Sequence, residues 1–177
     1  MSYISVDIES DNESPANGSM VCFGAVLVKD MSKTFYGKTK PITNQYNPNA
    51  LAISGFTREE HEQFDDPAKV MYEFYEWLKE VSQGNPTFIS DNPAFDWQWI
   101  NYYFHKYSNE HMIKNPFGFS ARRIGDLYCG LVKNASKNSD WKRKYRITKH
   151  THNPIDDAKG NAEALLAIQK LGLNIKF

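Results

Sequence analysis

Acidic side chains occur at three places along the chain where a short segment could hold them in fixed positions. Asp7 and Glu9 lie near the N-terminus, Asp96 lies in the middle and Asp157 lies near the C-terminus. Four carboxylates without a Cys or His cluster suit Mg²⁺ or Mn²⁺ better than zinc. Two such ions, about 3.5–4 Å apart, can assist an in-line phosphoryl displacement. The sequence therefore predicts a site for two divalent cations at Asp7, Glu9, Asp96 and Asp157.

His152 is the residue best suited to take a proton from an attacking water. It precedes Asn153, a good helix N-cap, and Pro154, which suits the first turn of a helix. His152 then takes position N′ and Asp157 takes N4, two positions that meet at a stapled helix start. We therefore expect the imidazole beside the Asp157 carboxylate. The alternative is an exposed polar helix start, with Asp157 favoured by the helix dipole.

A strand with strict period-2 alternation carries the first two acids. From residue 4 to residue 9 apolar side chains alternate with polar ones, so Asp7 and Glu9 share one face. Asp11 and Glu13 continue the spacing, but they fall in a stretch rich in Asn, Ser, Pro and Gly. We expect these two as solvated loop acids.

The remaining elements follow from apolar patterning and helix caps. Strands are expected at residues 4–9, 21–28, 33–40, 87–90 and about 120, the first three as an antiparallel meander, and residues 41–50 as loop. Helices are expected after Thr57, after Asp66, from Pro93 to about Tyr107, before Leu131 and from Pro154 to Leu171. This mixed order predicts one α/β domain over residues 1–177, with a mixed sheet flanked by helices.

Composition narrows the class of protein. The chain has 177 residues, 41% of them hydrophobic, and its formal net charge is zero, so no global field attracts a polyanion. Its two cysteines, Cys22 and Cys129, form no metal-spaced pair and suggest buried thiols in a reducing compartment. The sequence has no signal peptide pattern and no apolar run of membrane-spanning length. We expect a cytoplasmic protein with no membrane partner, and a homodimer stays open.

A local cluster of positive charge precedes the histidine. Residues 133–149 hold seven Lys or Arg against one acid, Asp140. Such a run is often only a solvated face. Because this one leads into His152, we expect Lys142, Arg143 and Lys144 to contact phosphates without reading sequence. The interleaved Trp141 and Tyr145, and also Phe56, Phe95 and Trp97, are candidates for stacking on bases, with core packing as the alternative.

The acidic sites and the histidine together resemble a known family. Asp7-Ile8-Glu9, Asn92-Pro93-Ala94-Phe95-Asp96 and His152 with Asp157 resemble the three motifs of the DEDDh family of 3′-5′ exonucleases. Ribonuclease T and the proofreading subunit of bacterial DNA polymerase III are of this type. The segment Ser54-Gly55-Phe56-Thr57 looks like the part that the family uses near the 3′ end of its substrate.

The resemblance implies a ribonuclease H-like fold with a five-stranded mixed sheet. It also implies two divalent cations, Mg²⁺ or Mn²⁺, and hydrolysis of single-stranded DNA or RNA from the 3′ end to nucleoside monophosphates. His152 would be the general base, and Asp7, Glu9, Asp96 and Asp157 would be the catalytic metal ligands. Substrate contacts are implied at Ile8, Ser54, Phe56, Asn92 and Phe95.

The spacing of the family motifs decides between neighbouring candidates. It selects Asp157 over Asp156, which falls at the capping-box position N3. It selects His152 over His150, which we expect as a solvated loop histidine. Asp96 is favoured over Asp91, which would lie outside the helix. The alternative function is a catalytically inactive nucleic-acid-binding module of the same fold, and the complete acid set argues against it. The choice between DNA and RNA depends on 2′-hydroxyl contacts that the sequence does not declare.

Overall fold

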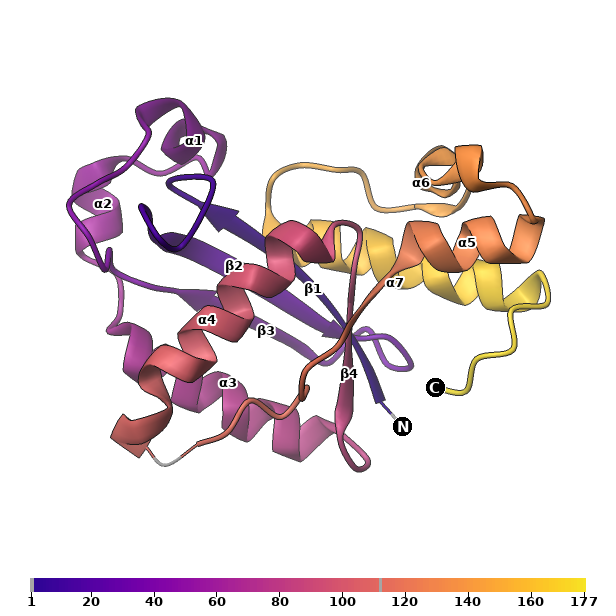
Figure 1. Cartoon of the computed structure of the whole chain (residues 1–177), viewed down its shortest axis with the longest axis horizontal. Helices are drawn as coiled ribbons and strands as arrows, with labels where there is room; N and C mark the ends of the chain where they lie inside the picture. Colours follow the sequence, from indigo (N-terminus) through magenta and orange to yellow (C-terminus); the bar gives the residue numbers. More distant parts are fainter. Residues whose placement is uncertain (1, 112) are drawn as a thin grey trace.

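A mixed five-stranded sheet forms the centre of the computed structural model, which describes residues 2–111 and 113–177 apart from the side chains of residues 109–111. The strands are β1 (Ser2–Ser10), β2 (Met20–Leu27), β3 (Thr34–Lys38), β4 (Pro86–Ser90) and β5 (Ala121–Arg123), in the spatial order β3-β2-β1-β4-β5 (Figure 1). The first three strands are antiparallel, as expected, and β4 and β5 run parallel to β1. The predicted fold class is confirmed. Of the expected domain, residues 1–177, Met1 and Met112 lie outside the described residues.

Helices cover both faces of the sheet. They are α1 (Pro48–Ile53), α2 (Arg58–Glu62), α3 (Pro67–Val81), α4 (Pro93–His111), α5 (Ile124–Val132), the 3₁₀ turn η1 (Ala135–Lys137), α6 (Asp140–Tyr145) and α7 (Pro154–Lys170). The helices α3 and α4 lie on one face and α7 lies on the other, while α1 and α2 lie together beyond the ends of β1 and β2 (Figure 1). No helix of the described part of the chain is both long and apolar enough to cross a membrane.

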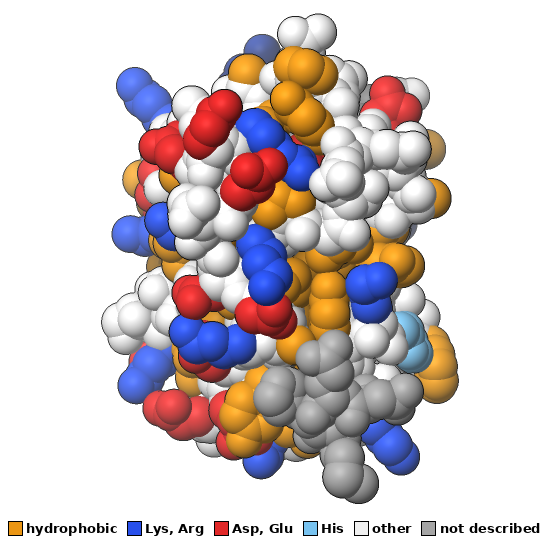
Figure 2. All heavy atoms as spheres, turned by 90° about the vertical axis from the view of Figure 1, so that its left-hand side faces the viewer, with side chains coloured by type: hydrophobic (Ala, Val, Ile, Leu, Met, Phe, Trp, Pro, Cys, Tyr) orange, Lys and Arg blue, Asp and Glu red, His pale blue; other side chains and the backbone are white. Residues whose placement is uncertain are grey.

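The alternation of β1 divides the core into two layers. Ile4, Val6 and Ile8 pack with α3 and α4, whereas Tyr3 belongs to the layer beneath α5 and α7. Asp7 and Glu9 have the same parity as Tyr3, so they lie on the α7 face. The face seen in Figure 2, on the side of α1 to α3, intersperses positive and negative side chains, as a net charge of zero leads one to expect.

Gly24 lets α7 approach the sheet closely. It is the β2 partner of Asp7, and a Cβ atom built on it would lie 2.4 Å from the carbonyl carbon of Pro154. Only a residue without a side chain allows the first turn of α7 to lie this near the strand. The contact therefore sets how far the start of α7, with Asp157, stands from β1.

One helix contradicts the sequence-based expectation, and another was not predicted. Helix α1 occupies part of the segment expected as loop, and α6 forms within the basic segment, for which no element was expected. The start of α1 carries the same Asn-Pro signal that begins α7, because Asn47 accepts a hydrogen bond from the Asn49 N–H and Pro48 follows it. The interpretation of residues 41–50 as loop was therefore wrong from Pro48 onward.

Candidate active site

Three acids from the two ends of the chain meet at one edge of the sheet. Asp7 and Glu9 come from β1 and Asp157 comes from the first turn of α7. Within the described residues, these are the acids that each bring one carboxylate oxygen within 4.8 Å of the others. Glu9 is 9% exposed and Asp157 is fully buried. Such a group has the donor type and closeness that a divalent cation requires.

Asp96 reaches the same edge from the start of α4. It is 4% exposed, and burial raises its pKa to about 7. The pKa of Asp7 is raised well above its usual value, first by burial and then by the charges of Asp96, Asp157 and Glu9. The fourth acid therefore lies near enough to act on Asp7 electrostatically, although it is outside the 4.8 Å group.

The electrostatics of this edge favour a bound cation. Burial, and then the charge of Asp157, raises the pKa of Glu9 to about 7. Carboxylates that are buried together resist ionisation unless positive charge lies between them. The donors are oxygen atoms, which hard cations prefer. The residues present therefore fit a divalent cation.

Asp157 is held by four donors from the preceding loop. Its Oδ1 lies 2.7 Å from Arg146 Nη2 and 2.7 Å from His150 Nδ1, and it accepts the Thr151 N–H at 3.3 Å. Its Oδ2 accepts the backbone N–H of His152 at 3.0 Å. His150 is a solvated loop histidine as expected, with its side chain 54% exposed, but its ring also contacts Asp157, which the sequence did not indicate. Arg146 was not anticipated as part of the site.

The imidazole of His152 turns toward Glu9. Its Nδ1 lies 3.3 Å from Glu9 Oε1, whereas the Asp157 carboxylate that we expected beside the ring accepts the backbone N–H of His152. The backbone explains the difference, since His152 adopts φ +59°, in the left-handed region. That conformation lets the peptide N–H face Asp157 while the ring points to β1. Strained backbone of this kind persists where the surrounding contacts hold it, often at functional sites.

Two acidic residues of α7 form hydrogen bonds with the loop that carries His150 and His152. Glu163 accepts hydrogen bonds from the N–H groups of Ile147 and Thr148 and from the Thr148 hydroxyl. Asp156 accepts the Thr151 hydroxyl at 3.1 Å, so its expected capping-box role is wrong. These contacts tie the loop to the helix over two turns. The histidines are thus positioned by α7.

A cavity of about 450 Å³ opens beside Asp7 along the basic segment. Its lining residues are Asp7, Asp91, Lys142, Arg143, Arg146, Ile147, Thr148, Lys149, His150 and Asn161. Lys142 forms an ion pair with Asp91, and Arg143 is exposed. Lys144 points elsewhere, toward Asp140 and the Tyr128 hydroxyl. The structure therefore brings Lys142 and Arg143 to the acidic edge and leaves Lys144 apart.

Most of the aromatic stacking candidates belong to the core. Trp141 is fully buried and its indole N–H donates to the Asn138 carbonyl at 2.9 Å, so it cannot stack on a base. Trp97 and Phe95 pack against the core layer of α4, and Tyr145 contacts the Tyr128 ring. Core packing, the alternative interpretation, is the one that these rings adopt.

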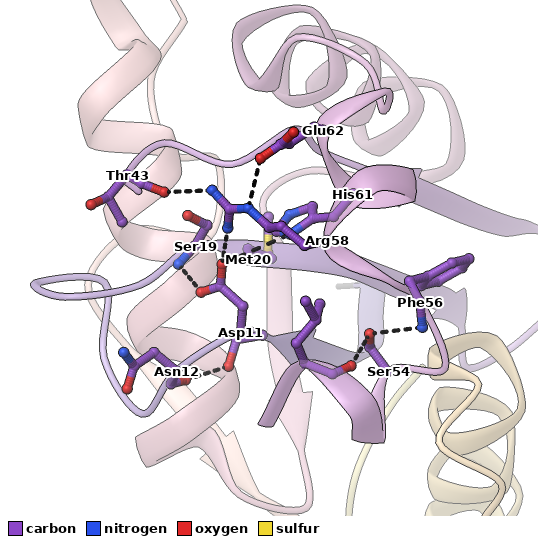
Figure 3. Close-up of polar contacts among 12 residues, drawn as sticks. Asp11, Asn12, Ser19, Met20, Thr43, Ser54, Phe56, Arg58, His61 and Glu62 are labelled. Carbon is purple, nitrogen blue, oxygen red and sulfur yellow. Dashed lines mark hydrogen bonds and ion pairs between the residues drawn. The ribbon is translucent and has the colours of Figure 1, made fainter. Parts of the chain in front are cut away.

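The residues expected to contact substrate differ in accessibility. Asn92 is exposed, whereas Ile8 is 3% exposed in the core, so only its backbone is left for a substrate. The Ser54 hydroxyl donates to the Leu51 carbonyl at 2.6 Å and orders the turn before Phe56 (Figure 3). The Phe56 ring is partly buried and contacts Phe64.

Asp11 is the buried acid that the sequence interpretation placed wrongly. It is fully buried, not solvated, and its carboxylate meets the Arg58 guanidinium at 3.2 Å. The period-2 spacing that links Asp7, Glu9 and Asp11 was the available signal. For Arg146 the signal was only its place in the basic segment.

Comparisons with known proteins agree with this geometry. The sequence profile of the 3′-5′ exoribonuclease Rv2179c-like domain matches residues 2–169. A curated relative, the 3′-5′ DNA exonuclease Cap18 of Escherichia coli, is 33% identical over 181 residues, which are 96% of this chain and 92% of the relative.

Solved structures share the fold at low sequence identity. The nuclease domain of 3′hExo, a DEDDh family member bound to rAMP, superimposes with a TM-score of 0.73 at 17% identity, over 99% of this chain and 94% of that one. The E. coli ExoI–ssDNA complex in its zinc ion bound form superimposes with a TM-score of 0.65 at 16% identity, over 96% of this chain and 40% of that one.

Proposed function

Because the chain belongs to the family of 3′-5′ exoribonuclease Rv2179c-like domains, we propose that it hydrolyses single-stranded DNA or RNA from the 3′ end to nucleoside monophosphates. Its predicted membership of the DEDDh 3′-5′ exonucleases is confirmed. The observation that carries the proposed reaction is the meeting of Asp7, Glu9 and Asp157 within 4.8 Å, with Asp96 buried beside them. The inactive binding module is not favoured, because this acid set is complete.

The acidic edge is the proposed cation site. Asp7, Glu9, Asp96 and Asp157 would hold two divalent cations, Mg²⁺ or Mn²⁺. When bound, the cations supply charge stabilisation for the attacking and leaving oxygens of the phosphodiester. The chain's own contribution is to keep the four carboxylates close and partly dry, which their burial supports.

His152 is the proposed general base. With Nδ1 directed at Glu9 Oε1, the ring presents its other nitrogen, Nε2, to accept the proton of the attacking water. Half of the side chain is exposed, so the proton can pass on to solvent. The αL backbone and the bond from its N–H to Asp157 hold the ring in this direction.

We assign binding of the single-stranded nucleic acid to two regions beside the acids. Lys142 and Arg143 line the cavity at Asp7 and are proposed to contact phosphates. The Ser54–Phe56 turn, between α1 and α2, is proposed to meet the 3′-terminal nucleotide. The names of the relatives point to different substrates, since the matching domain is called an exoribonuclease and the curated relative is called a DNA exonuclease.

Digestion of matched 5′-labelled DNA and RNA oligomers with Mg²⁺ or Mn²⁺ tests the function. We expect a ladder that shortens from the 3′ end and release of nucleoside monophosphates, with both lost in EDTA and in the Asp7→Asn variant. Comparison of the two sugars at equal concentration assigns the substrate class. Intact oligomers after incubation of wild-type protein with Mn²⁺ would refute the proposal.

A further inference from the structure

Asp11 directly follows β1, two residues beyond Glu9. Its Oδ1 accepts the Ser19 N–H, and its Oδ2 accepts Arg58 Nη1 at 3.2 Å (Figure 3). The side chain is fully buried. This buried carboxylate lies two residues from Glu9 in the sequence and outside the group of acids that could hold a cation.

Arg58 uses each of its three nitrogen atoms to join a different part of the chain. Besides Asp11, its Nη2 donates to the Thr43 carbonyl at 3.0 Å and its Nε donates to Glu62 at 3.0 Å (Figure 3). The guanidinium also lies 4.7 Å from the centre of the Tyr46 ring. The side chain is 13% exposed, so it serves contacts within the protein. A planar guanidinium suits such a fixed set of acceptors, which a lysine could not satisfy.

The two helices that flank the Ser54–Phe56 turn both attach to Asp11. Helix α2 attaches through Arg58, its first residue. Helix α1 attaches through its N-cap, because the Asn47 N–H donates to the Asp11 carbonyl at 2.7 Å. The turn between the helices is therefore held to β1 from both sides, at a residue two positions away from Glu9.

Arg58 is the cationic partner of the Asp11 carboxylate. His61 also faces this carboxylate, with Nδ1 3.8 Å from Oδ2, but burial and then the charge of Arg58 lower the pKa of His61 to about 4. His61 is therefore neutral near pH 7. Loss of Arg58 would leave the buried Asp11 without a cationic partner among the described residues, and an unpaired buried charge is strongly unfavourable.

We propose that the Asp11–Arg58 ion pair positions the Ser54–Phe56 turn relative to the acidic edge and so sets the binding of the 3′-terminal nucleotide. Asp11 and Arg58 are positioning residues, since neither needs to touch the substrate. The inference rests on the proposed function. It adds that the substrate-binding turn and the acids are held at a fixed distance by one buried ion pair.

Steady-state kinetics on a single-stranded oligomer test the inference. Arg58→Met should raise KM about ten- to hundredfold, because the displaced turn would lose its contact with the 3′-terminal nucleotide, and loss of one base-stacking contact weakens binding by a factor of this order. Its kcat at saturating substrate should stay within about threefold of wild type, since the acids and His152 are untouched. Global destabilisation would instead reduce the amount of active protein, and so the apparent kcat, without changing KM.

Further variants guard against a failure of Arg58→Met to fold. Arg58→Lys retains the charge and should show an intermediate KM, and Asp11→Asn retains the bond to Ser19 and should show a smaller rise. The control is Lys69→Met, which removes an exposed ion pair with Asp65 and should leave both constants unchanged. Melting temperatures are measured for every variant.

The outcomes separate the inference from the proposed function. If wild-type protein digests no oligomer, the proposed function fails first. If wild-type protein is active and folded Arg58→Lys and Asp11→Asn keep the wild-type KM, the inference is refuted. A fall in kcat at unchanged KM, in variants whose melting temperature equals that of wild type, also refutes it, because the ion pair would then act on the acids and not on the turn.

Discussion

The ring of His152 lies against Glu9, 143 positions earlier in the chain, with Nδ1 3.3 Å from Oε1. The neighbouring His150 instead contacts Asp157 through Nδ1 at 2.7 Å. The two rings stand 4.4 Å apart, centre to centre. Each histidine therefore has its own carboxylate, and this pairing separates their expected functions.

His152→Ala should lower kcat by about 10²–10⁴, the usual effect of losing a general base. It should keep a metal-induced rise in melting temperature, since the four acids remain. His150→Ala is the matched variant, and we expect its kcat to fall much less, because Arg146 still holds Asp157. The measurements are single-turnover rates and thermal melts with Mn²⁺ or EDTA. A larger rate loss for His150→Ala would transfer the general-base role to that residue.

Divalent cations should stabilise the protein. A ligand that binds only the folded state at a hundredfold excess over its dissociation constant adds about 2.7 kcal/mol to the free energy of unfolding. Asp157→Ala should lose this stabilisation and activity together. Glu76→Gln, at an exposed carboxylate paired with Lys79, is the control and should keep both. Equal melting temperatures with millimolar Mn²⁺ and with EDTA would argue against a preformed cation site.

The metal-free protein should lose stability as pH rises. The pKa values of Glu9 and Asp96 are raised to about 7, so the folded state binds more protons than the unfolded chain between about pH 4, the ordinary carboxyl value, and about pH 7. The contribution of these two groups to the free energy of unfolding is therefore fully present below about pH 4 and is lost as the pH rises to about 7. Melts in EDTA should show the decline, and Glu9→Gln should show a shallower one. If the stability of Glu9→Gln declined with pH as steeply as that of wild type, the assignment of part of this decline to Glu9 would be contradicted.

The basic segment should act through Lys142 and Arg143. Replacing both with alanine should weaken oligomer binding and reduce the slope of log K against log salt by about 1–2, as fewer counterions are released. Lys144→Ala is the matched control, because Lys144 faces Tyr128 and Asp140 and not the cavity. Fluorescence anisotropy across a salt series measures both. If Lys144→Ala changed the affinity and the salt dependence as much as the double replacement does, the basic segment would be only a solvated face.

Gly24→Ala should disturb the site through packing. Its Cβ would meet the backbone of Pro154 and displace the start of α7, at a cost of about 1–3 kcal/mol for overpacking. Because Asp157 lies in that turn, metal-induced stabilisation should fall as well. Gly130→Ala, where α5 leaves open space, should be neutral or stabilising. Normal metal stabilisation in Gly24→Ala would show that α7 tolerates displacement.

Local patterns predicted the elements that carry the acids. The alternation of β1 placed Asp7 and Glu9 on one face, and the Asn-Pro signals marked the starts of α4 and α7 correctly. The same signal at Asn47 lies among polar residues, so its segment has the composition of a loop. Where the pattern was strictly local, the sequence was sufficient.

Contacts between distant segments were not predictable in this way. The direction of the His152 ring depends on a left-handed backbone and on Glu9, and neither is visible in residues 150–157. Asp11 appeared solvated because its buried partner, Arg58, is 47 positions away. Trp141 appeared as a surface ring because its neighbours are basic, yet its face of α6 is buried. Each error concerns a partner that only the folded chain supplies.

The dependence of the site on α7 also orders its assembly in time. Strand β1, with Asp7 and Glu9, is synthesised before α7, because His152 and Asp157 follow Asp7 about 145 to 150 positions later. Until α7 docks over Gly24, a nascent chain has Asp7, Glu9 and Asp96 but lacks Asp157 at the acidic edge. Domains fold largely as units once their chain is available. The acid set is thus complete only after the chain has been synthesised through α7.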